Sequence, residues 1–221
     1  MGITQTPLPG ADAAALGIAA FVAVYAKGIW ALVKHFSVMA HEGGHAITAK
    51  FMGFGVRKVE LKRNGDGLTR YRVPAVGGKG VLTGFAGYLA PSAFGLAAAG
   101  LIKLGFIVAV LWMAVIFLLI LLLRVFRSFN FGLISVPVVI GLFVILNLYA
   151  SVSLQVAMAY VITWVLLLSG FSMAVNHWTG AGDAMSLKRQ THLPRWLWAI
   201  LWVAGTFGAV YLGFRLLVLG S

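Results

Sequence analysis

Long apolar stretches separated by short polar intervals run through almost the whole sequence. A helix needs about 20 consecutive apolar residues to cross a bilayer core of roughly 30 Å, and several stretches reach that length. The pattern predicts an all-α polytopic membrane protein with about seven transmembrane helices. The expected spans are, in chain order, about residues 8–26, 29–53, 80–102, 104–123, 131–150, 154–175 and 195–218. Because Lys27 and Lys34 interrupt the first long stretch, six spans with a bent first hairpin is the alternative.

The interval at about residues 55–79 is polar but has the pattern of paired strands. Residues 56–61 and 68–73 each alternate apolar and charged side chains, as strands with one buried face do. The turn-forming run Asn-Gly-Asp-Gly lies between them, at residues 64–67. We expect a small β-hairpin here, which is either a plain connector or an edge strand that accepts an extended substrate segment.

Basic residues gather in the intervals between the predicted spans. The chain has 17 Lys and Arg against 5 Asp and Glu, which gives a net charge of +12. In a membrane protein this excess is typical of cytoplasmic loops, and we expect no nucleic-acid partner. Three basic intervals follow the second span, follow the fourth span and precede the seventh span. If the spans alternate strictly in direction, all three intervals lie on one side of the membrane. This side is predicted to be cytoplasmic, with the hairpin and the N-terminus inside and the C-terminus outside.

The overall composition agrees with one integral-membrane domain over residues 1–221, with the hairpin as an insertion. Hydrophobic residues make up 61% of the chain, and the mean hydropathy is +0.98. The sequence contains no cysteine, which excludes disulfides and thiolate metal ligands. Any metal ion must therefore be bound by nitrogen and oxygen atoms.

The run His41-Glu42-Gly43-Gly44-His45 is the most informative motif, because it lies inside the second predicted span. An ionisable residue at bilayer depth costs roughly 2.5–3.5 kcal/mol on insertion scales, so its presence indicates a functional site. On a helix, residues four apart share one face, so His41 and His45 can bind one metal ion. Glu42 can then act as the general base toward a metal-bound water.

A catalytic zinc site usually takes three protein ligands, so one ligand is still missing. Asp183 is the best candidate, since it lies in a glycine-rich segment just after the sixth span and the chain has few acids. The alternative role for Asp183 is a helix N-cap before residues 184–187. His177 is the alternative third ligand.

Residues 38–55, VMAHEGGHAITAKFMGFG, resemble the active-site helix of the site-2 protease family of intramembrane zinc metalloproteases. The sequence is most similar to the small bacterial branch that lacks a PDZ domain. The Gly87-Tyr88-Leu-Ala-Pro91-Ser92 run and the Gly182-Asp183-Ala184 run also resemble this branch. The resemblance implies a Zn²⁺ cofactor held by His41, His45 and Asp183, and a place in the bacterial cell membrane.

One departure concerns the segment before Asp183. Better-studied members of the family carry an asparagine and prolines before a Leu-Asp-Gly run, whereas this chain has Asn176 in a different context. We retain Asn176 and Tyr88 as candidate substrate-binding residues. For Tyr88 the alternative role is helix packing.

The sequence therefore predicts a membrane-embedded zinc endopeptidase that cleaves membrane-protein substrates within or near a transmembrane segment. Two other classes of function compete with this prediction. A catalytically inactive relative would bind membrane partners without cleaving them. A zinc transporter would use the histidine motif as a transport site, but it needs further metal-binding side chains along a pathway, and the other spans hold almost none.

Overall fold

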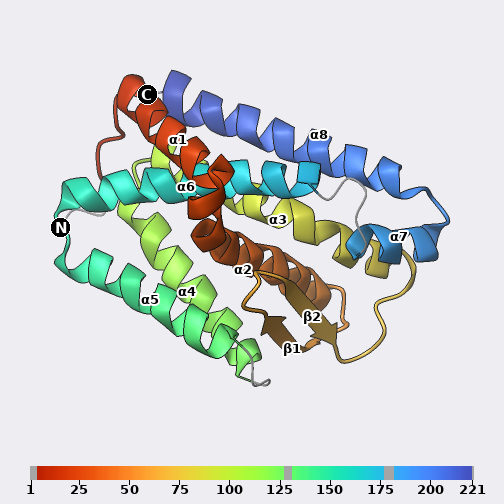
Figure 1. The fold of residues 1–221 in the computed structure, drawn as a ribbon. Helices are drawn as coiled ribbons and strands as arrows, with labels where there is room; N and C mark the ends of the chain where they lie inside the picture. Colours follow the sequence, from red (N-terminus) through yellow and green to blue (C-terminus); the bar gives the residue numbers. More distant parts are fainter. Residues whose placement is uncertain (1–3, 127–130, 177–181, 221) are drawn as a thin grey trace.

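The computed structural model describes residues 4–126, 131–176 and 182–220, with backbone only at 31–32. The apolar runs form helices, and the alternating runs form two strands (Figure 1). The elements are α1 (Gly10–Tyr25), α2 (Lys27–Phe51), β1 (Val56–Leu61), β2 (Gly67–Tyr71), α3 (Gly77–Lys103), α4 (Ile107–Val125), α5 (Gly132–Tyr149), α6 (Val152–Asn176), α7 (Asp183–Thr191), α8 (Arg195–Phe214) and a π-helical end, η1 (Arg215–Leu219).

Five helical segments among the described residues are long and apolar enough to cross a membrane: α3, α4, α5, α6 and the continuous pair α8–η1. The helix α1 is apolar but has only 16 residues. The helix α2 has 25 residues but carries the histidines, Glu42 and lysines. The prediction of a largely helical chain with apolar, membrane-length helices and one small sheet is thus confirmed.

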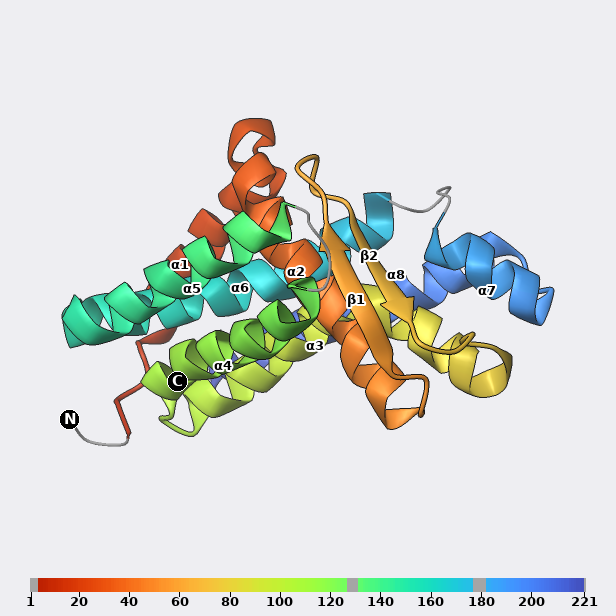
Figure 2. The same cartoon turned by 90° about the horizontal axis from the view of Figure 1, so that it is seen from below.

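The helices α1 and α2 do not form an antiparallel hairpin. They meet at Ala26, which has extended backbone angles (φ −77°, ψ 117°), and both advance toward the end that holds the β-hairpin (Figures 1 and 2). A single extended residue bends the chain but is too short to reverse it.

The beginning and the end of the described chain therefore lie at the same end of the molecule (Figures 1 and 2). The amide of Gln5 donates to the carbonyl of Gly105 at 2.8 Å, in the turn between α3 and α4. Gly220 lies near Lys103, at the same turn. Strict alternation of seven spans would separate these two ends, so the span count of seven is not confirmed.

The predicted β-hairpin is confirmed as an antiparallel pair of β1 and β2, with Val59 opposite Thr69. Val56, Val59 and Leu61 of β1 are buried. The tip is stabilised by a hydrogen bond from the amide of Lys62 to the carbonyl of Asp66, at 2.8 Å. The hairpin lies along α2 (Figure 2), which brings one strand close to the histidine motif.

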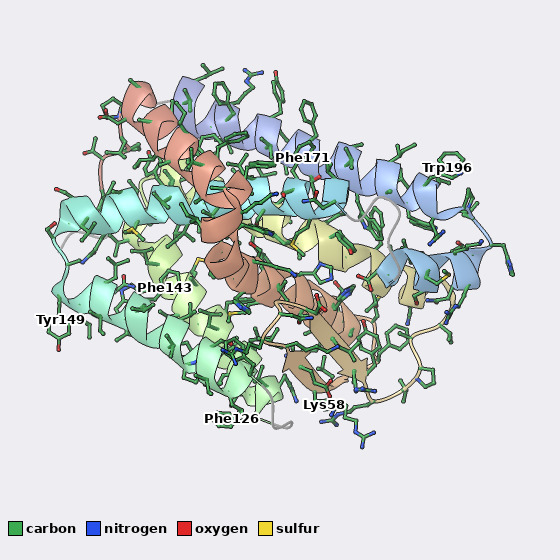
Figure 3. The ribbon with its side chains drawn as sticks, in the orientation of Figure 1. Lys58, Phe126, Phe143, Tyr149, Phe171 and Trp196 are labelled. Atoms are coloured by element: carbon green, nitrogen blue, oxygen red, sulfur yellow. The ribbon has the colours of Figure 1, made fainter. Side chains whose placement is uncertain are left out.

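The helices α3 and α6 form the centre of the helical layer, and small residues let them approach closely. Ser92 on α3 donates to the carbonyl of Leu167 at 2.9 Å. A Cβ atom on Gly170 of α6 would lie 2.2 Å from the Ser92 hydroxyl oxygen, so a larger residue does not fit there. Many large apolar side chains are exposed on the outer faces of the helices, and Phe126, Tyr149 and Trp196 project outward (Figure 3).

Candidate metal centre

Three ligand-type side chains converge in the interior near the hairpin end of the fold. His41 and His45 lie one turn apart on α2 and are both buried. Their Nε2 atoms are 3.2 Å apart. One carboxylate oxygen of Asp183 lies 3.1 Å from Nε2 of His45 and 3.3 Å from Nε2 of His41. The structure thus brings together all the residues that the sequence indicated as metal ligands.

Asp183 reaches the histidines because α7 packs against a row of glycines on α3. A Cβ atom on Gly84 would lie 3.2 Å from Leu187, and one on Gly80 would lie 2.7 Å from the Gln190 side chain. Gly182 precedes α7 with φ 100°, a conformation that favours glycine. Asp183 is the first residue of α7, and the N-cap position is occupied by Gly182. Its carboxylate faces the histidines instead, which excludes the alternative N-cap role.

Gly87, one turn further along the same face of α3, makes room for the two imidazoles. A Cβ atom at this position would lie 2.3 Å from Nε2 of His45 and 2.9 Å from Cε1 of His41. The next residue, Tyr88, packs its ring edge-on against His41, with the ring centroids 4.7 Å apart. The Tyr88 ring also packs on Trp202, with the centroids 4.4 Å apart.

The protonation of His45 is set by a backbone carbonyl. Its Nδ1 lies 2.8 Å from the carbonyl oxygen of Thr83. A carbonyl can only accept a hydrogen bond, so Nδ1 must carry the proton. In the neutral ring, Nε2 then has a free lone pair, as metal-binding histidines do. Nδ1 of His41 is buried and has no hydrogen-bond partner within the described part of the chain.

The donor set fits a metal ion such as zinc. For a tetrahedral ion with bonds of about 2.0–2.1 Å, neighbouring ligand atoms lie about 3.3 Å apart. The three measured separations, 3.1, 3.2 and 3.3 Å, are close to that value. Burial raises the pKa of the Asp183 carboxyl, but when the neighbouring histidines carry a proton on Nε2, their charge and hydrogen bonds outweigh burial and hold that pKa well below its usual range. A bound metal ion would take the place of those protons, and the carboxyl is ionised in both cases.

Glu42 lies beside the histidines but is held by the hairpin. It is only 3% exposed. The Thr69 hydroxyl on β2 donates to Oε2 of Glu42 at 2.6 Å, and it also approaches the Glu42 carbonyl at 3.3 Å. A Cβ atom on Gly67 would lie 2.4 Å from Oε1 of Glu42, so the strand can approach this closely only with glycine there.

A cavity of about 840 Å³ opens onto this group of side chains. Glu42, both histidines and Asp183 line it, together with residues of the hairpin, α3, α6 and α7. The candidate substrate-binding residues Tyr88 and Asn176 also line it. Asn176 is exposed and donates to the Ser172 hydroxyl at 3.2 Å. His177, the alternative ligand, lies outside the described residues.

Sequence reasoning did not single out two further cavity residues, Thr69 and Tyr71. They are two apart on β2 and therefore point to the same face of the strand. Burial, followed by the carboxylates of Asp183 and Glu42, raises the pKa of Tyr71, so its phenol keeps its proton at neutral pH. The alternation of residues 68–73 could have revealed their shared face, but not what that face touches.

Comparison with known proteins identifies one family. Residues 14–213 match the sequence model of the family described as Peptidase M50B-like. No curated protein and no solved structure matches the chain at a significant level.

Proposed function

Because this chain belongs to the Peptidase M50B-like family, whose members are metallopeptidases of the site-2 protease type, we propose that it is an active intramembrane zinc endopeptidase. Its substrates would be membrane proteins, which it cleaves within or near a transmembrane segment. In this proposal His41, His45 and Asp183 hold the zinc ion and Glu42 is the general base.

One observation carries the proposal. Three potential ligand atoms from α2 and α7 lie within 4.8 Å of one another, and Glu42 lines the same cavity. A ligand set alone would suit a structural ion or a transport site. A buried carboxylate beside that set, in a cavity large enough for a peptide segment, is what hydrolysis requires.

A zinc ion in this site would supply a Lewis acid that polarises the scissile carbonyl and makes water more acidic. Glu42 accepts a proton from the attacking water as the new carbon–oxygen bond forms. It then donates that proton to the amine nitrogen as the carbon–nitrogen bond breaks. The first step protonates the Glu42 carboxylate and the second step returns it to the ionised form, so Glu42 is regenerated at the end of the reaction.

A substrate must also be extended at the point of cleavage, because the peptide groups of a helix are hydrogen-bonded and shielded. Gly67, Leu68, Thr69 and Tyr71 of β2 line the cavity. Within the part of the chain that the structure describes, this strand pairs only with β1, in a two-stranded sheet. We propose that its second edge pairs with the unwound substrate segment. Tyr88 and Asn176, at other parts of the cavity wall, would contact the same segment.

We propose that the hairpin end of the molecule is cytoplasmic. The hairpin segment from Arg57 to Lys79 and the connection around Lys188 and Arg189 lie at this end (Figure 1), and they hold many of the basic residues. Because α1 and α2 run toward the same end of the molecule, together they would cross the membrane once. This supports six membrane crossings rather than seven. The segments near Gln5 and Gly220 would then both be extracytoplasmic.

The test uses the purified protein in liposomes with a fluorescent single-span test protein whose span is weakened by glycine and serine. We expect zinc-dependent cleavage by the wild type, with new termini in or near the span by mass spectrometry. Glu42→Gln should show no cleavage. Zinc bound without cleavage would favour the inactive relative, and zinc flux across the liposome would favour the transporter.

A further inference from the structure

The Glu42 side chain accepts a hydrogen bond from the hairpin. Thr69 of β2 donates to Oε2 of Glu42 at 2.6 Å. Thr69 is itself only 8% exposed. A hydroxyl donor to an ionised carboxylate makes a short, charge-assisted hydrogen bond, which is stronger than one between neutral groups. The base is thus held by a strand that is separate in sequence from its own helix.

We propose that Thr69 is a positioning residue for Glu42. Its hydroxyl holds the carboxylate in the orientation that proton transfer requires. The proposal rests on the function proposed above, in which Glu42 is the general base. A glutamate side chain has several rotatable bonds, and a carboxylate that samples several rotamers is aligned with the reacting water for only part of the time. One fixed oxygen leaves the other free to exchange the proton.

The surroundings of Thr69 are built for this contact. Gly67, two residues earlier on the same face of β2, places only backbone against Oε1 of Glu42, where a Cβ atom would lie at 2.4 Å. Opposite Thr69, Val59 of β1 is fully buried and anchors the pair of strands in the core. The strand cannot move toward or away from Glu42 without disturbing that packing.

The hairpin tip is fixed to α2 as well. Lys34 donates from Nζ to the carbonyl of Asn64 at 3.1 Å, and it pairs with the Asp66 carboxylate at 3.5 Å. Lys34 precedes Glu42 on α2 by about two helical turns. The hairpin therefore contacts α2 at two places, at Lys34 through its tip and at Glu42 through Thr69. Together these contacts fix the position of Thr69 along α2.

The chain allows a direct measurement of this hydrogen bond, because Glu42 and Glu60 are its only glutamates. Protein labelled with ¹³C at the glutamate carboxyl should give two carboxyl signals by NMR, and Glu60→Gln assigns them. Thr69→Val keeps the side-chain shape but removes the hydroxyl. We expect it to shift the Glu42 signal and leave Glu60 unchanged, while Thr69→Ser restores the wild-type position.

A matched control is Thr163→Val. Thr163 is also buried, but its hydroxyl donates to the carbonyl of Ala159 at 2.7 Å, within α6. This variant should leave both glutamate signals in place. It separates the loss of a buried hydroxyl in general from the loss of the contact with Glu42.

Cleavage of the single-span test protein supplies the kinetic part. Thr69→Val should lower kcat by roughly 10- to 100-fold, the range expected for one hydrogen bond to a charged group. KM, zinc content and the cleavage position should stay unchanged. Thr69→Ser should recover most of kcat, and Thr163→Val should behave as the wild type.

The outcomes separate the two proposals. An unshifted Glu42 signal in Thr69→Val, or a wild-type kcat, overturns the positioning role alone. A rise in KM or a loss of zinc in Thr69→Val also overturns it, because the residue would then serve binding or folding. Absence of cleavage by the wild type overturns the proposed function, and with it any role of Thr69 in catalysis.

Discussion

Nδ1 of His45 on α2 lies 2.8 Å from the backbone carbonyl oxygen of Thr83 on α3. The helix α3 contributes no metal ligand, but this contact sets the tautomer of the His45 imidazole. Gly87, one turn after Thr83 on α3, leaves the space that the same imidazole fills. The orientation of His45 is thus decided by α3 from two sides. The helix α3 therefore orients a candidate metal ligand without supplying a ligand itself.

The first prediction concerns zinc binding by α2. The double variant His41→Ala/His45→Ala should lose the roughly one zinc ion per chain expected for the purified protein, because it removes two of three ligands. Elemental analysis after gel filtration measures this. The matched control is His35→Ala/His192→Ala, which removes two histidines outside the site and should keep the metal. Full zinc retention in the first variant would contradict the site.

The second prediction concerns Glu42. Glu42→Gln should keep zinc but lower cleavage by at least about 10²–10⁴-fold, because it removes a general base without removing a ligand. Cleavage rate and zinc content are measured on the same preparation. Glu60→Gln, the chain's other glutamate, is the control and should cleave normally. Near-normal cleavage by Glu42→Gln would show that another group is the base.

The third prediction concerns Asp183. Loss of a residue that only hydrogen-bonds to a metal ligand typically weakens metal binding by about 10–100-fold. Asp183→Ala should weaken zinc binding by more than this, because it removes a direct ligand. Competition with a fluorescent zinc chelator measures the affinity. His177→Ala tests the alternative ligand in the same assay and should keep the wild-type affinity. The assignment fails if the two variants exchange these behaviours.

The fourth prediction uses two glycines of α3. Gly87→Ala should reduce zinc binding and cleavage, because the new Cβ atom would lie 2.3 Å from Nε2 of His45. Gly100→Ala, on the same helix, meets no atom within 4 Å. It should bind zinc normally and stabilise α3 by up to about 1 kcal/mol through helix propensity. Equal zinc affinity of the two variants would show that α3 does not confine the imidazoles.

The fifth prediction concerns the direction of α1 and α2. The chain has no cysteine, so each introduced cysteine is the only thiol. Cysteines at Thr6 and Leu104, which lie at one end of the fold, should react with an impermeant maleimide from the same side of a sealed vesicle. A cysteine at Asn64, on the hairpin, should react from the other side. Labelling of Thr6 and Asn64 from the same side would restore the strict alternation of seven spans.

Several features of this protein follow from the sequence alone because they depend on local geometry. The apolar runs predicted the helices, since a backbone in an apolar environment must satisfy its own hydrogen bonds. The spacing of His41 and His45 predicted one shared helix face, because helical periodicity holds whatever packs around it. The turn at residues 64–67 predicted the hairpin for the same reason.

Other features were decided only by the tertiary structure. Asp183 and His45 are separated by 138 positions in the chain, and their contact depends on how α7 packs on α3. The direction of α1 relative to α2 depends on the single residue Ala26 and on the contacts of Gln5 at the far end of the fold. The bond from Thr69 to Glu42 depends on where the hairpin lies against α2. The hydrophobic pattern indicates which segments are helical and apolar, but it does not determine which helices pack together. The close approaches at glycines and the few polar contacts between helices decide that.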